Sequence, residues 1–85
     1  MEFEIKIKPL VLFDLQDKIE AEEQRVAGGG KHLYEDFLNG LAAIKEQSQN
    51  KPPVYETVQE YIAADASCKL FYMVNGSTIY VMGLL

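Results

Sequence analysis

Few residues of this chain could do chemistry, and they are spread along it. His32 is the only histidine and Cys68 the only cysteine. A histidine acting as a general base needs an adjacent nucleophile or an orienting carboxylate, and Glu35 and Asp36 are the nearest carboxylates in sequence. Carboxylates at that position more simply favour the positive end of a helix dipole. We therefore interpret His32 as an exposed surface histidine and assign no catalytic residue.

Two other patterns could hold a ligand, and each has a simpler structural interpretation. Gly28-Gly29-Gly30 is glycine-rich, but a helical pattern precedes it and it lacks the spacing of a phosphate-binding loop, so it predicts a helix stop and a turn. The acidic residues between Asp14 and Glu23 predict a solvated helix face, because no ligand spacing accompanies them. Cys68 is interpreted as a small, partly buried hydrophobe. We expect no metal and no cofactor.

The charge balance argues against a nucleic-acid partner. Thirteen acidic residues outnumber eight basic ones, which gives a net charge of −5, and Arg25 is the only arginine. Affinity for phosphate backbones needs clustered Lys and Arg. The 85 residues predict one domain, 1–85. No membrane span or signal peptide is visible, and a lone cysteine suits a reducing compartment, so we expect a cytoplasmic protein.

The first half of the chain predicts a strand and two helices. Residues 2–8 alternate apolar and charged side chains, which indicates a half-buried strand. Leu10–Ala27 and Lys31–Gln49 show helical spacing, and the glycine turn between them predicts an αα-hairpin. The expected core stripes are Leu12, Leu15, Ile19 and Val26 on the first helix, and Leu33, Phe37, Leu41 and Ile44, widened by Tyr34 and Leu38, on the second. Gly40 inside the second helix predicts close approach of the first helix or the sheet.

The second half ends in the strongest local signal of the sequence. Asn75-Gly76 lies between two apolar, β-prone runs, Lys69–Val74 and Thr78–Leu85, which predicts a hairpin with a two-residue loop. That loop would pair Val74 with Ser77 and Tyr72 with Ile79. Upstream, Val54–Ala66 fits a strand or a helix, and its pattern alone does not separate the two.

The hairpin register predicts two apolar faces, because residues paired across an antiparallel ladder share a face. The first face carries Leu70, Tyr72, Val74, Ile79 and Val81, and the second carries Phe71, Met73, Tyr80 and Met82. A domain of this size can cover one of them with its own helices. We expect an α+β fold: a single antiparallel sheet with the αα-hairpin packed on its first face, over Phe3, Ile5 and Ile7 as well. The second face is the candidate partner-binding site.

This order of elements resembles the RelE/ParE family of toxins from type II toxin–antitoxin systems, also known as plasmid stabilisation proteins. Three segments carry the resemblance: Phe3–Pro9 is similar to the first strand of the family, Tyr34–Leu41 to its second helix, and Leu70–Gly76 with Thr78–Val81 to its terminal hairpin. The resemblance implies the chain order β-α-α-β-β-β and makes 56–64 a strand. It also implies that the second sheet face receives the C-terminal segment of an antitoxin.

The departures from the family pattern bear on activity. Messenger-RNA nucleases of the family use Lys and Arg in the middle strands and after the last one, whereas Val58–Tyr61 has no arginine and the chain ends at Leu85, as if shortened. No catalytic residue can be transferred, so we expect no ribonuclease activity. The resemblance then implies a bacterial toxin that acts by protein–protein contact, as on gyrase, and is neutralised by its cognate antitoxin. The alternative is a non-toxic relative that serves as a binding or dimerisation module.

Overall fold

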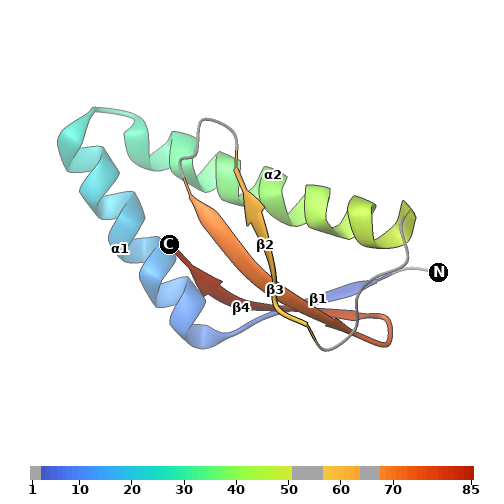
Figure 1. Cartoon of the computed structure of the whole chain (residues 1–85). Coiled ribbons are helices and arrows are strands. Elements are labelled where there is room, and N and C mark those ends of the chain that lie inside the picture. Colours follow the sequence, from blue (N-terminus) through green and yellow to red (C-terminus); the bar gives the residue numbers. More distant parts are fainter. Residues whose placement is uncertain (1–2, 51–56, 64–67) are drawn as a thin grey trace.

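The computed structural model describes residues 3–50, 57–63 and 68–85, and they form two helices and four strands (Figure 1). The chain order is β1 (Glu4–Ile7), α1 (Pro9–Arg25), α2 (Gly29–Asn50), β2 (Gln59–Ile62), β3 (Lys69–Asn75) and β4 (Thr78–Leu84). This confirms the α+β class and the expected order of elements. Within the ambiguous segment 54–66, residues 59–62 form a strand. The expected strand ends at 56 and 64 lie outside the described residues.

The four strands form one sheet in the order β1-β4-β3-β2. The two ladders between β2, β3 and β4 are antiparallel, as expected, but β1 runs parallel to β4, so the sheet is mixed. A parallel pair needs a long connection between its strands. Here the whole αα-hairpin with β2 and β3 lies between β1 and β4 in sequence, which permits the parallel pair.

The hairpin turn lies one residue later than the sequence predicted. Asn75 pairs with Thr78, so the loop is Gly76-Ser77 and not Asn75-Gly76. Gly76 has φ +63° at the first central position, where hairpin turns need a positive φ. The predicted pair Tyr72–Ile79 is replaced by Tyr72–Val81. Because the partner shifts by two residues, every side chain keeps its predicted face, and the two-face assignment survives the wrong register.

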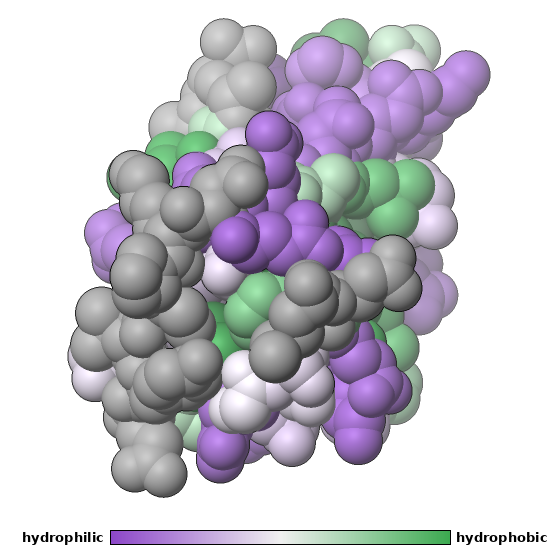
Figure 2. All heavy atoms as spheres, turned by 90° about the vertical axis from the view of Figure 1, so that its right-hand side faces the viewer, coloured by the Kyte–Doolittle hydropathy of each residue, from purple (hydrophilic) through white to green (hydrophobic). Residues whose placement is uncertain are grey.

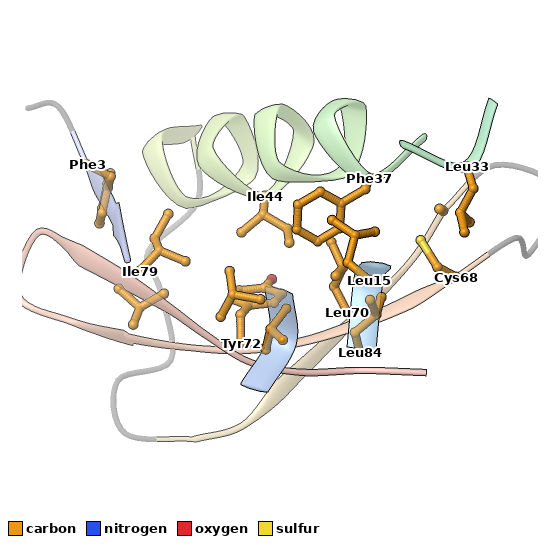
Figure 3. Close-up of a cluster of buried hydrophobic side chains, with 14 residues drawn as sticks. Phe3, Leu15, Leu33, Phe37, Ile44, Cys68, Leu70, Tyr72, Ile79 and Leu84 are labelled. Atoms are coloured by element: carbon orange, nitrogen blue, oxygen red, sulfur yellow. The ribbon is translucent and has the colours of Figure 1, made fainter. Parts of the chain in front are cut away.

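Both helices pack on the same face of the sheet, as predicted (Figures 1 and 3). In Figure 3 Phe37 and Ile44 point from α2 towards Leu70 and Ile79. The most deeply buried side chains, each less than 2% exposed, come from both helices and both central strands: Val11, Ile44, Leu70, Val74, Ile79 and Val81. Ile5 and Ile7 pack against this cluster as partly buried residues, and Phe3 belongs to it.

The predicted helix stripes were wrong at four positions. Leu12 and Val26 are about half exposed, and Val11 takes the central place on α1 with Leu15. Successive helical residues are about 100° apart, so Leu12 points sideways when Val11 faces the sheet. Val26 lies just beyond the helix end. Tyr34 and Leu38 on α2 are exposed as well.

Gly40 allows α2 to approach the sheet, as its position predicted. A Cβ atom placed there would lie 3.1 Å from Leu70 Cδ1 and 3.3 Å from Tyr61 Cε1. Both side chains belong to the sheet, which identifies the sheet and not α1 as the neighbour that requires glycine.

Candidate binding face

The side of the sheet opposite the helices, here called the open face, carries the four predicted site residues. Phe71 and Met73 lie on β3, Tyr80 pairs directly with Met73 on β4, and Met82 follows on β4. Strand residues alternate between faces, and the residues between these four are buried under the helices. The four side chains themselves are partly exposed. The described part of the chain thus brings all four to one side of its two central strands.

A β-bulge shapes one end of the open face. Tyr72 pairs with Val81, whereas Phe71 pairs with Gly83, so Met82 is an extra residue in β4. A Cβ atom on Gly83 would lie 3.6 Å from Phe71 Cδ2 and 3.8 Å from Phe71 Cβ, so the aromatic ring lies beside the glycine. The bulge also returns Leu84 to the buried face, where it is 5% exposed. Neither effect was visible in the sequence.

Edge-strand residues extend the open face, and the sequence reasoning missed them. Lys6 on β1 pairs with Tyr80, and Glu60 on β2 pairs with Phe71. Ile62 pairs with Lys69 and is 53% exposed, so it adds a large apolar side chain at the edge. The signal that could have found them is the strand pairing, which no pattern inside a single segment contains.

The charges divide the molecule into two unlike sides. The helix layer is acidic, because α1 alone carries Asp14, Asp17, Glu20, Glu22 and Glu23 against Lys18 and Arg25. The open face and its edges carry the lysines at 6, 8 and 69 with the glutamates at 4 and 60, although the whole chain has a net charge of −5. Among the described residues, Lys6 and Lys8 lie at the β1 edge together with Glu4, Lys69 lies on β3, and Glu60 lies on the β2 edge. Figure 2 shows the side of the molecule that lies at the right in Figure 1, where separate hydrophobic patches lie between hydrophilic side chains.

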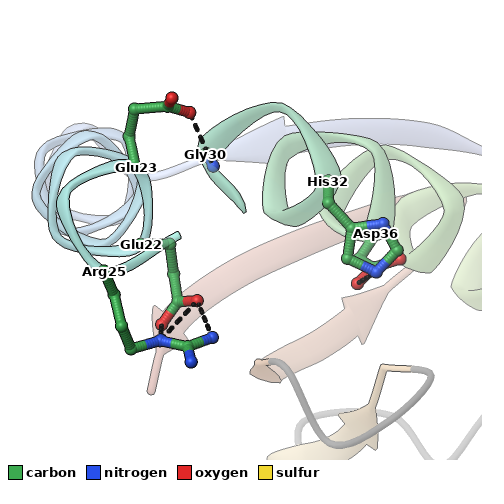
Figure 4. Close-up of polar contacts among 6 residues, drawn as sticks. All are labelled: Glu22, Glu23, Arg25, Gly30, His32 and Asp36. Carbon is green, nitrogen blue, oxygen red and sulfur yellow. Dashed lines mark hydrogen bonds and ion pairs between the residues drawn. The ribbon is translucent and has the colours of Figure 1, made fainter. Parts of the chain in front are cut away.

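The histidine lies on α2, away from the sheet. His32 Nε2 is 3.5 Å from Asp36 Oδ2, and the imidazole side chain is 66% exposed (Figure 4). This agrees with the surface interpretation of His32 and identifies Asp36, not Glu35, as its partner. His32 is therefore an exposed histidine oriented by a neighbouring carboxylate. Cys68 is 3% exposed and packs in the core, more deeply than expected.

The glycine turn binds a carboxylate of the chain itself (Figure 4). Glu23 accepts hydrogen bonds from the backbone N–H groups of Gly28, at 3.0 Å, and Gly30, at 3.2 Å. Cβ atoms on Gly29 and Gly30 would lie within 2.8 Å of backbone oxygens of α1, so these glycines let the two helices meet closely. The predicted helix stop is confirmed, but the turn is shorter than predicted, because α2 already begins at Gly29 and only Gly28 of the three glycines lies in the turn. The amides that a phosphate would use are already occupied by Glu23.

The single arginine is also held locally. Arg25 Nη2 donates to Glu22 Oε2 at 2.7 Å, on the exposed surface of α1. The hydrogen bond from Arg25 lowers the pKa of the Glu22 carboxyl, and the same bond raises the pKa of Arg25. The guanidinium therefore lies in the helix layer, on the opposite side of the molecule from the open face.

On the face of the sheet that the helices cover, Tyr72 links β3 to β2. Its hydroxyl donates to Gln59 Oε1 at 3.4 Å, across the ladder that pairs the two residues. Burial raises the pKa of Tyr72 above its ordinary value. This phenol belongs to the covered face and lies apart from the candidate binding residues.

Comparison with known proteins finds no matching family model, no matching curated protein and no matching solved structure. Among the described residues, no three His, Cys, Asp or Glu side chains are grouped so that they could hold a metal ion. Neither α1 nor α2 has the length and apolar character needed to cross a membrane. The site is thus defined by its own geometry: an apolar strip on two central strands with charged edges.

Proposed function

We propose that this protein is the toxin component of a type II toxin–antitoxin module of the RelE/ParE kind. It acts through protein–protein contacts, with a gyrase-like protein as its target. Its cognate antitoxin neutralises it by laying a segment across the open face. The observation that carries the proposal is that, among the described residues, both helices pack on the same side of the sheet. Both helices cover one face, and Phe71, Met73, Tyr80 and Met82 remain partly exposed on the other.

The composition of this strip suits protein recognition. Aromatic and methionine side chains are enriched in the cores of protein–protein interfaces, and flexible methionines adapt to a partner surface. The edges supply Lys6 and Glu60 as polar rim residues. Such a rim orients a partner and raises specificity more than affinity.

The positions of the basic residues disfavour ribonuclease activity as the mechanism. Stabilising a cleaving phosphate requires donors arranged around the developing charge. Arg25 is paired with Glu22 on α1, and His32 contacts Asp36 on α2, so neither lies on the open face. We expect no transcript cleavage by the isolated protein. Specific cleavage that vanishes in His32→Ala would contradict this expectation.

Controlled expression in a bacterial host tests the function. Expression should arrest growth, and co-expression of a small antitoxin encoded beside this gene should relieve the arrest. Replacing Phe71 and Tyr80 together with Ser should abolish binding of that antitoxin in calorimetry while the protein stays folded. Phe13→Ser is the matched control, because Phe13 is a 66% exposed aromatic residue of α1. Normal growth with unchanged folding would instead favour the alternative, a non-toxic binding or dimerisation module.

A further inference from the structure

The open face has a charge pattern that is complementary to itself. Phe71 pairs with both Glu60 and Gly83, and Val81 pairs with Ile7. Lys8, the exposed residue after Ile7, donates its backbone N–H to the Val81 carbonyl at 3.2 Å. Lys8 and Glu60 therefore lie at about the same level along the strands, at opposite edges of the face.

A two-fold axis between two sheets that meet face to face lies in the plane between them, and its two limiting directions are across the strands and along them. An axis perpendicular to the strands places each β1 edge, which carries Lys6 and Lys8 against Glu4, opposite the partner's β1 edge, and Glu60 on the same side as the partner's Glu60, so edges of like net charge meet. An axis parallel to the strands places β1 opposite the partner's β2, and β4 opposite the partner's β3. Only the second arrangement brings Lys8 to Glu60 of the other copy, and it does so twice, since a two-fold interface repeats each contact.

The same arrangement places the apolar strips against each other. Tyr80 and Met82 on β4 would cover Phe71 and Met73 on β3 of the other copy, and the reverse. Two central strands of seven residues and two edge strands of four, at about 4.8 Å spacing and about 3.3 Å rise, give a footprint of roughly 350 Å² per copy. The total, roughly 700 Å², is below the size of standard interfaces and limits the dimer to a weak, reversible complex.

We propose that, without a partner, a second copy of this chain covers the open face in a parallel-axis dimer held by its apolar strip and by two Lys8–Glu60 pairs. Self-association then regulates access to the open face, to which the proposed function assigns the antitoxin. This regulatory role rests on the proposed function. The two occupants compete, so the antitoxin binds the monomer. The dissociation constant of the dimer is expected to be on the order of tens of micromolar.

Sedimentation equilibrium of the intact protein, from about 1 to 500 μM so as to span that constant, tests the dimer. The mass should rise from 9.6 kDa towards twice that value. Lys8→Glu and Glu60→Lys should each weaken the dimer about tenfold or more, since like charges then face each other twice. The double variant, which restores the wild-type net charge, should recover the association to within about threefold. Phe13→Ser should leave it unchanged.

Each contrary outcome has a definite meaning. A wild-type protein that stays at 9.6 kDa over the whole range overturns the proposal. A dimer that ignores both charge reversals, or a double variant that remains a monomer, also overturns it, and circular dichroism checks that each variant is folded. A monomer that still arrests growth and binds its antitoxin would remove this inference and leave the proposed function standing. A charge-dependent dimer that neither arrests growth nor binds an antitoxin would do the reverse.

Discussion

Replacing Ile79 with Ala tests whether the sheet face under the helices is the core. Ile79 lies on β4 between Ile5 on β1 and Val74 on β3, and its side chain is 0% exposed. The substitution removes three carbon atoms, each worth about 0.8 kcal/mol in transfer from water, and leaves a cavity between sheet and helices. We therefore expect the free energy of unfolding to fall by about 3 to 4 kcal/mol.

That loss is large for a domain of this size. An 85-residue protein has roughly 4 to 13 kcal/mol of stability in total, so the variant should still fold at low temperature. The thermal midpoint should drop by about 12 to 32 °C, at about 4 to 8 °C per kcal/mol for small domains. Urea titration followed by far-ultraviolet circular dichroism measures the free energy, and calorimetry measures the midpoint.

Ile62→Ala is the matched control for this experiment. The residue type is the same, but Ile62 is 53% exposed on the open-face edge, so its replacement should cost less than about 1 kcal/mol. A loss below about half a kcal/mol for Ile79→Ala would place this side chain outside the core. It would refute both the sheet register and the assignment of the two faces.

Three further substitutions test individual contacts, each by chemical denaturation. Tyr72→Phe removes the bond to Gln59 and should cost about 0.5 to 1.5 kcal/mol at neutral pH. Burial raises the pKa of Tyr72, so the stability that Tyr72 contributes is fully present below about pH 10 and is lost as the pH rises through the higher folded-state pKa. The free energy of unfolding should therefore fall less steeply at alkaline pH in Tyr72→Phe than in the wild type, and equal slopes would contradict this. Glu23→Ala should cost about 1 kcal/mol, because two amides of the glycine turn lose their acceptor; an unchanged stability would show that the turn forms without it. Gly40→Ala should destabilise by about 1 kcal/mol, although Ala is the better helix former by a similar amount, because its Cβ would lie 3.1 Å from Leu70 Cδ1; a gain in stability would mean that the sheet yields easily.

Local patterns in the sequence were enough to predict the elements and the face that each strand residue occupies. Helical spacing identified Leu15, Phe37 and Ile44 as core residues, and all three are buried. Spacing alone did not choose between Val11 and Leu12, because the orientation of α1 depends on where the glycine turn lets it meet α2. That contact forms between the two helices, and the residue pattern within either helix does not predict it.

The pairing of distant strands was the part that the sequence could not predict. The parallel pair of β1 with β4 joins residues more than seventy positions apart, as in Glu4 with Thr78. Local periodicity contains no information on such a partner. The edge residues Lys6 and Ile62 were therefore missed, although the central residues Phe71 and Tyr80 were placed on the correct side of the hairpin.

Along β4, residues of the core alternate with residues of the candidate site, so substitutions at neighbouring positions test different properties. Ile79 is buried under the helices, and Tyr80, the next residue, is partly exposed on the open face. A slip of the strand by one residue would exchange the two environments and expose the core set to solvent. The register that protects the core therefore also fixes which side chains a partner can reach.

Beyond the bulge at Met82 the alternation reverses, and Leu84 becomes a core residue while Gly83 lies beside Phe71. The bulge thus ends the apolar strip with a glycine, and this limits the contact area that any partner can gain beyond Phe71.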